Sequence, residues 1–182
     1  MSKLSQAIAE GDGISFIVEV SDSAGAKSAE SQGADGLAAI TNANAVRMTS
    51  ALPLLHLGHL FDAQGSASDA VVIKPDLAMW DEGHALGLEC IVRVRESSEL
   101  ERVLRYFDPE VFLLSVPDDA DEDPLAVVLG LLHDVPAGKL AIAELHDATP
   151  EDVSQLERSG VDAVLVSSGR LEALIQDDPP DV

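Results

Sequence analysis

The last third of the chain carries the residues best suited to chemistry. Leu140–Glu144 is an apolar run that ends on a carboxylate, and Val161–Val166 is a second apolar run. A short polar segment follows the second run and opens a helix: Ser167, Ser168, Gly169 and Arg170. Backbone N–H groups, hydroxyls and a cation at the end of a buried strand are groups with which α/β proteins bind phosphate. The segment is equally suited to be a plain helix cap, so both interpretations stand.

Charged residues near the ends of three other apolar runs could share a site with that segment. Glu19 is near the end of the first run, Lys74 follows the fourth, and Arg93 and Arg95 end the fifth. Glu19 and Glu144 could act as a base and a binding group. They could instead neutralise Arg93, because a buried charge is costly unless it is paired. The three cations could attract an anion or pair with nearby carboxylates.

Other kinds of site find little support in the residues. The histidines show no spacing typical of a zinc site, and we predict neither a metal nor a cofactor. They are His56, His59, His84, His133 and His146. Of these, His146 follows a predicted strand and could serve as an acid–base group. Cys90 is the only cysteine and stands in an apolar run, which is typical of a packing residue. The sequence has no Gly-x-Ser-x-Gly or Walker loop.

The elements that must position these residues alternate along the chain. Eight short apolar runs, rich in Val, Ile and Leu, are typical of strands covered on both faces of a parallel sheet. They are Ile14–Val20, Gly36–Ile40, Leu52–Leu57, Ala70–Ile73, Glu89–Val94, Val111–Val116, Leu140–Ala143 and Val161–Val166. Helix signals lie between them, over Ser23–Gln32, Asp76–Leu86, Ser97–Tyr106, Pro124–His133, Pro150–Ser159 and, more weakly, Asn42–Ser50 and His59–Ser66.

This alternation predicts parallel βαβ units with right-handed crossovers. Eight such units favour a compact (β/α)8 TIM barrel over a doubly wound sheet, which is the alternative. At 182 residues the chain is shorter than the roughly 250 residues usual for this barrel, so loops and helices must be shortened. We expect one barrel domain over residues 1–175 and a frayed acidic tail over residues 176–182.

Several segments also carry the motifs of a known family. They are Ile17-Val18-Glu19-Val20-Ser21, then Leu86–Arg95 followed by Glu99-Leu100-Glu101-Arg102, then Thr149-Pro150-Glu151-Asp152-Val153, and Gly160–Ser167. In their order and spacing, from about Ile14 to Ile175, they resemble indole-3-glycerol phosphate synthase, one of the ribulose-phosphate-binding barrels. The last two segments are shared by several barrel families, whereas the second is more particular to this one.

The resemblance implies a ring-closing condensation, decarboxylation and dehydration on a phosphorylated anthranilate, with a Lys acid and Glu partners. Glu19 and Glu144 match carboxylates of that family. The Asn and Arg that should follow the sixth strand are missing. The other expected groups are replaced: a Lys by Ser21, the acid Lys by Leu57, a Glu by Arg93 and a phosphate-binding Ser-Gly by Leu145-His146.

Because several groups are replaced together, the resemblance implies a degenerate member, a pseudoenzyme without the ring-closing decarboxylase reaction. Such a barrel would bind a phosphorylated metabolite at its C-terminal mouth. One alternative is an active carbon–carbon lyase of tryptophan biosynthesis, or a related sugar-phosphate enzyme, that uses relocated residues. A second alternative is a non-catalytic barrel that binds a partner protein of unknown kind.

The net charge of the chain limits the kinds of partner that it can bind. Asp and Glu total 33 against 11 Lys and Arg, for a net charge of -22. Such a surface repels nucleic acid and anionic membranes. No run suits a membrane span or a signal peptide, so we expect a cytoplasmic protein. Many Asp and few Lys also suggest a halophilic protein in a salt-rich cytoplasm, where screening relieves self-repulsion. A melting temperature that rises from low to molar salt would support that idea, and a flat one would indicate an ordinary acidic protein.

Overall fold

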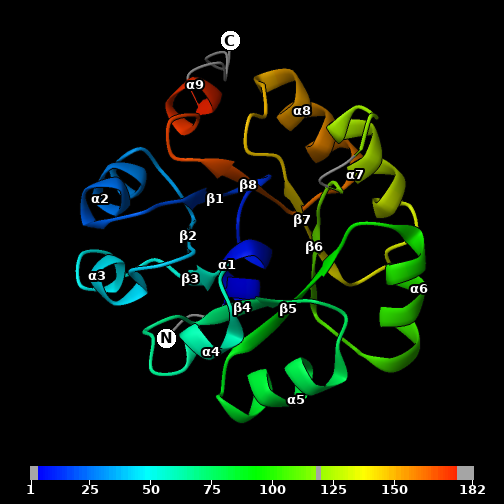
Figure 1. Cartoon of the computed structure of the whole chain (residues 1–182). Coiled ribbons are helices and arrows are strands. Elements are labelled where there is room, and N and C mark those ends of the chain that lie inside the picture. The colour runs from blue at the N-terminus through cyan, green and yellow to red at the C-terminus, as the bar shows by residue number, and fades with distance from the viewer. Residues whose placement is uncertain (1–3, 118–119, 176–182) are drawn as a thin grey trace.

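The computed structural model describes residues 4–117 and 120–175 and contains a closed barrel of eight parallel strands (Figure 1). Each strand pairs with the next in the chain, and β8 pairs with β1 to complete the ring. The predicted (β/α)8 barrel is confirmed, and the doubly wound alternative is wrong. The tail predicted over residues 176–182 lies outside the described residues. The strands are β1 (Ser15–Glu19), β2 (Gly36–Ala39), β3 (Leu54–His56), β4 (Ala70–Ile73), β5 (Glu89–Val94), β6 (Val111–Leu114), β7 (Leu140–Glu144) and β8 (Ala163–Ser167).

Helices connect the strands and surround the ring (Figure 1). They are α1 (Leu4–Ala9), α2 (Ser23–Ser31), α3 (Ala43–Arg47), α4 (Leu60–Ala63), α5 (Leu77–Ala85), α6 (Ser97–Tyr106), α7 (Pro124–Leu132), α8 (Pro150–Ser159) and α9 (Leu171–Ile175). The two segments with weak helix signals form α3 and α4, of five and four residues. These short connectors show how a closed barrel fits a chain of this length. No helix in the described parts of the chain is long and apolar enough to cross a membrane.

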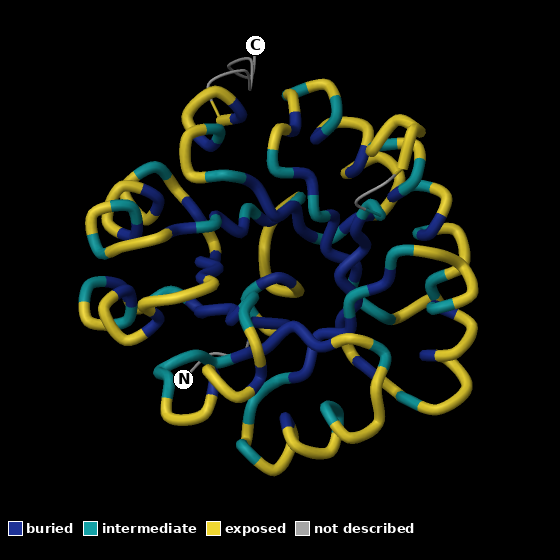
Figure 2. The backbone as a smooth tube through the Cα atoms, in the orientation of Figure 1, coloured by how far each residue is buried: buried dark blue, intermediate teal, exposed yellow. Residues whose placement is uncertain are grey.

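Two apolar layers hold the barrel together. Successive side chains of a strand point to opposite faces, so each strand contributes to a cluster inside the ring and to another beneath the helices. Figure 2 shows the buried strands as an inner ring within the exposed outer turns of the helices. The inner cluster includes Ile17, Ala38, Leu55, Ala70, Val72, Ile91, Val111, Leu113, Ile142, Ala163 and Leu165.

Helix α1 closes the N-terminal end of the barrel. Its Leu4 and Ile8 are buried and belong to the inner cluster. The backbone N–H of Ser5 donates a hydrogen bond to Glu89, the first residue of β5, at 3.2 Å. Figure 1 shows α1 across the centre of the ring. With this end covered by α1, the strands finish at the opposite end of the barrel.

Three aspartates fix the register of the strands. Asp35, Asp69 and Asp162 stand directly before β2, β4 and β8. Their carboxylates accept hydrogen bonds from backbone N–H groups on the neighbouring strand, at Phe16 (2.8 Å), Leu54 (2.9 Å) and Ala141 (2.8 Å). Each of these bonds joins the start of one strand to its neighbour. Since a slip of one residue would turn every side chain to the other face, the three clamps also decide which residues point into the mouth.

Candidate functional site

Three of the charged residues singled out in the sequence meet in the C-terminal mouth of the barrel. Glu19, Arg93 and Glu144 lie on β1, β5 and β7, each two residues after an isoleucine of the inner cluster. Because side chains along a strand alternate with a period of two, all three point into the opening above that cluster. The C-terminal end of the strands is where barrels of this class form their sites.

Contacts join these residues to two more. The Nη2 atom of Arg93 donates to Oε1 of Glu144 at 2.9 Å, and the hydroxyl of Ser115 donates to the other oxygen of the same carboxylate. The ring of His146 lies between the two glutamates. Its Nδ1 is 3.3 Å from Oε2 of Glu19, and its Nε2 is 3.5 Å from Oε1 of Glu144. We call these five residues the mouth cluster.

The environment of Glu144 favours its charged form. The Glu144 side chain is only 12% exposed, and this burial by itself would raise the pKa of the carboxyl. Hydrogen bonding from His146, the charge of Arg93 and the hydroxyl of Ser115 outweigh burial and lower the pKa of Glu144 below its ordinary value. A carboxylate held in this way is a weak base, because all of its partners stabilise the form without a proton.

His146 responds to the same charges in the opposite sense. Its hydrogen bond to Glu144 raises its pKa above the ordinary 6.5, burial opposes that rise, and the negative charges of Glu144 and Glu19 add to it. The side chain is 43% exposed, so it can exchange protons with water. With His146 protonated, the cluster contains two carboxylates and two cations, and its formal charge is zero. The arrangement can therefore hold a proton at the imidazole while Arg93 remains charged.

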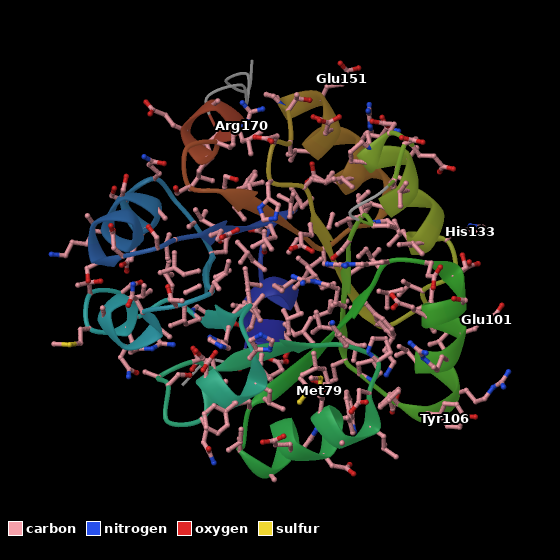
Figure 3. The ribbon with its side chains drawn as sticks, viewed as in Figure 1. Met79, Glu101, Tyr106, His133, Glu151 and Arg170 are labelled. Atoms are coloured by element: carbon pink, nitrogen blue, oxygen red, sulfur yellow. The ribbon has the colours of Figure 1, made fainter. Side chains whose placement is uncertain are left out.

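The predicted phosphate segment lies beside the cluster but is occupied with contacts of its own. Ser167 pairs with Glu19 across β8 and β1, and its backbone N–H donates to the carbonyl of His146 at 3.1 Å. The guanidinium of Arg170 donates to the carbonyls of Asp147 and Ala148 at 2.8 and 3.3 Å. Figure 3 shows Arg170 on the side of the barrel formed by α8 and α9. Ser168 and Gly169 are exposed, and α9 has five residues. Ser167 and Arg170 thus brace the loop after β7.

The two remaining predicted cations follow β4 and β5. Lys74 is exposed and lines a pocket together with Arg93. Arg95 is half-buried, and its backbone N–H donates to the carboxylate of Glu99 at 2.8 Å. The structure therefore groups Lys74 with Arg93 in one pocket, whereas Arg170 is held by the loop after β7.

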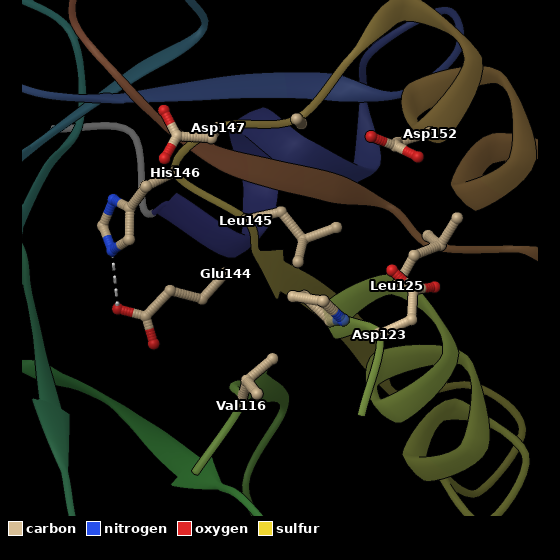
Figure 4. A pocket seen from close by; sticks show the side chains of 10 residues that line it. Val116, Asp123, Leu125, Glu144, Leu145, His146, Asp147 and Asp152 are labelled. Atoms are coloured by element: carbon tan, nitrogen blue, oxygen red, sulfur yellow. Dashed lines mark ion pairs between the residues drawn. The ribbon is translucent and has the colours of Figure 1, made fainter. Parts of the chain in front are cut away.

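A second pocket, which we call the acidic pocket, lies beside the mouth cluster, on the side away from the pocket of Lys74 and Arg93. Its volume is about 390 Å³, and four carboxylates line it together with His146 (Figure 4). Figure 4 shows Glu144 and His146 on one wall, with residues from the start of α7 and α8 facing them. Two of the carboxylates cap those helices: Asp123 accepts from the N–H of Ala126, and Asp152 completes a capping box with Thr149. The lining carboxylates are Asp123, Glu144, Asp147 and Asp152.

The described residues contain no group of three or more His, Cys, Asp or Glu side chains placed to hold a metal ion. His56, the last residue of β3, is buried, and its Nε2 contacts the carbonyl of His59 at 3.2 Å. This contact fixes the turn between β3 and α4. Cys90 is buried, and burial followed by the charge of Glu89 raises the pKa of its thiol to about 11. Both residues are explained by packing.

The sequence pointed to most of the mouth cluster but missed one member and one contact. Ser115 follows β6 directly, and no recognisable motif surrounds it. A signal was available in its spacing, because Ser115 lies two residues after Leu113 of the inner cluster and so shares its inward direction. The bridging position of His146 depends on how the loop after β7 turns back over the mouth, which alternation along a strand does not predict.

Fold and site together define a (β/α)8 barrel with a charged site at the carboxyl ends of its strands. Two solved structures share this fold at low sequence identity, so their similarity to this chain concerns the fold alone. N-acetylmannosamine-6-phosphate 2-epimerase from Clostridium perfringens has a TM-score of 0.72 and 14% identity, covering 89% of each chain. Thiamine phosphate pyrophosphorylase from Pyrococcus furiosus has a TM-score of 0.70 and 13% identity, covering 90% of each chain.

In sequence, the chain is similar to curated indole-3-glycerol phosphate synthases, and it is a divergent relative of them. It is 25% identical to that of Geobacillus sp. over 177 residues, 33% to that of Polaromonas sp. over 120 residues and 30% to that of Variovorax paradoxus over 140 residues. These alignments cover 84%, 66% and 70% of this chain. They span 67%, 41% and 53% of the length of the relatives. No protein-family model matches the chain.

The contacts of His146 predict how its proton affinity responds to mutation. Replacing Glu144 by Gln removes a negative charge next to the ring, so the pKa of His146 should fall in E144Q. The matched variant E151Q removes a charge from the exposed side of α8 (Figure 3) and should leave that pKa unchanged. Titration of the imidazole Cε1 proton by NMR measures both.

The same contact has a consequence for stability. A raised pKa in the folded state means that His146 stabilises the fold at acid pH and loses this contribution as the pH rises through the folded-state pKa.

In the NMR titration, equal curves for His146 in the wild type and E144Q would show that the two side chains are not coupled.

Proposed function

We propose that this protein is an indole-3-glycerol-phosphate-synthase-like barrel that has lost the ring-closing decarboxylase reaction and binds a small phosphorylated molecule at its C-terminal mouth. The observation that carries the proposal is the ion pair between Arg93 and Glu144 at the centre of the mouth, 2.9 Å long. The resemblance places a proton-transferring Glu where Arg93 stands. A guanidinium is permanently charged near neutral pH, so it cannot take over that role.

The replacements elsewhere in the mouth support the loss of this reaction. Leu57 follows β3 where the resemblance expects the acid Lys, and Ser21 follows β1 where it expects a second Lys. Neither side chain supplies an ammonium group. A positioned proton-transfer group is worth roughly 10²–10⁴ in rate. Two such positions, Leu57 and Arg93, are changed together with the substrate-steering position at Ser21. The two matching carboxylates, Glu19 and Glu144, are engaged with His146 and Arg93, so they neutralise charge within the protein.

Two observations support a phosphorylated ligand. The relatives and structural neighbours carry a phosphate compound in their names: indole-3-glycerol phosphate, N-acetylmannosamine-6-phosphate and thiamine phosphate. In this chain, cations also remain at the mouth although acidic residues outnumber basic ones threefold, 33 to 11. Lys74 and Arg93 line one pocket there, and two positive charges in a cleft raise the local concentration of anions.

One observation favours a second candidate function, an active lyase that uses a relocated acid. His146 is half-exposed, lies against two carboxylates, and has a pKa raised above 6.5. A histidine at the edge of a pocket, beside two carboxylates, is suited to general acid–base catalysis. In this second candidate function, Glu19 and Glu144 would set the proton affinity of His146, and the reaction would not need the missing lysines.

An activity assay separates the two candidates. We expect no growth of indole fluorescence above the buffer rate when the purified protein is incubated with the family's phosphorylated anthranilate substrate, because the acid groups are replaced. Fluorescence growth that is lost in the variant His146→Asn would instead establish the relocated-acid lyase. The growth would have to survive in His133→Asn, a control at the exposed end of α7 (Figure 3).

The ligand-binding part is tested separately. Sugar phosphates and inorganic phosphate should raise the melting temperature, since a ligand at 100 times its dissociation constant stabilises the folded state by about 2.7 kcal/mol. A melting temperature unchanged by all of them would contradict the phosphorylated ligand.

A further inference from the structure

We propose that the pocket between β3 and β5 binds a small organic anion, one with an anionic head and an apolar body. This inference rests on the ligand-binding part of the proposed function and deepens it, because it assigns the ligand to one half of the mouth and to one chemical class. We call this cavity the basic pocket. Its volume is about 300 Å³, and it is lined by residues that include Leu57, His59, Val72, Lys74, Met79 and Arg93.

The charge of the basic pocket is opposite to that of the chain. Lys74 and Arg93 line it, and no carboxylate does so among the residues that the structure describes. Among the residues that the structure describes, the acidic pocket on the other side of the mouth is lined by four carboxylates and by neither Lys nor Arg. The Arg93–Glu144 pair separates the two, since Arg93 lines one pocket and Glu144 lines the other. An anion that enters the mouth is therefore repelled from the side of β7 and attracted to the side of β4 and β5.

Both cations retain donors for a ligand. Across the described parts of the chain, the Lys74 ammonium has neither an ion pair nor a hydrogen bond, and the side chain is exposed. Arg93 is 21% exposed and donates to Glu144 through Nη2; its Nε is buried without a partner, and its Nη1 makes no hydrogen bond to a described residue. A guanidinium offers five N–H donors in one plane, so the ion pair with Glu144 leaves others for a phosphate or carboxylate head.

The remaining walls select an apolar body. Leu57 and Val72 come from the ends of β3 and β4, and Met79 reaches the pocket from α5; Figure 3 shows Met79 between that helix and the strands. Val72 belongs to the inner cluster, and Leu57 packs against it. A fully hydrated ion such as inorganic phosphate would leave these surfaces uncovered. The volume lies at the lower end of small-molecule pockets, which are about 300–1,000 Å³. A single ring with one anionic group is of suitable size.

Calorimetric titration with three probes tests this assignment. Phenyl phosphate carries both features, benzoate replaces the phosphate by a carboxylate, and inorganic phosphate has no apolar body. We expect phenyl phosphate to bind about tenfold more tightly than inorganic phosphate, because the ring buries apolar surface. Lys74→Gln should weaken phenyl phosphate about tenfold through loss of a charge-assisted hydrogen bond. The control Lys27→Gln removes the same charge from an exposed site on α2 and should change the dissociation constant less than about twofold.

Methyl NMR of the same samples locates the ligand. Signals of Leu57, Val72 and Met79 should shift on titration, and those of Leu125 and Leu145 in the acidic pocket should not. If the phosphate probes bind without an effect of K74Q and shift the acidic pocket instead, the assignment to the basic pocket is overturned while the phosphorylated-ligand proposal stands. If only benzoate binds and needs Lys74, the pocket stands and the phosphate requirement falls. If no probe binds, both proposals fall.

Discussion

The alternation of side chains around a closed barrel is the constraint on which the rest of this structure depends. Every second residue of each strand must point into one narrow interior. Along β1, β5 and β7 that direction is taken first by an isoleucine and then, at the mouth, by Glu19, Arg93 and Glu144. Three charges are thereby forced into one opening. They are tolerated because Arg93 pairs with Glu144, and His146 and Ser115 complete the network.

This constraint supports the proposal that the mouth binds a ligand and does not perform the ring-closing reaction. A catalytic carboxylate needs freedom to take or give a proton, whereas Glu144 is held by three donors that all favour its charged form. The same ion pair divides the opening into a basic and an acidic half. Under the proposed function, an arginine at position 93, where the resemblance implies a glutamate, would have two consequences: β5 would lack a proton-transfer group, and a cation would stand where a small anion could bind.

Much of the fold was predictable from the sequence, and the reason is physical. Eight apolar runs with β-branched residues admit few arrangements other than a parallel sheet, and their number favours closure. The helix predicted over Pro150–Ser159 is likewise confirmed as α8, which begins with a capping box of Thr149 and Asp152. The position of α1 was not, because Leu4 and Ile8 form too short an apolar pattern to indicate what they cover. Within the site, the position of Glu19, Arg93 and Glu144 near the ends of predicted strands pointed to these residues, but loop contacts decided the rest. Arg170 turns to two backbone carbonyls, and His146 folds back between the glutamates.

The central claim is that Arg93 and Glu144 stabilise one another at the centre of the mouth, and a double-mutant cycle tests it most directly. The free energy of unfolding would be measured by urea denaturation for the wild type, Arg93→Met, Glu144→Gln and the double variant. Each single change leaves a charge without its partner, so we predict losses of about 3 kcal/mol each. The double variant should lose less than the sum of the two, with a coupling of at least about 1 kcal/mol. Losses that add to within about 0.5 kcal/mol would contradict the account.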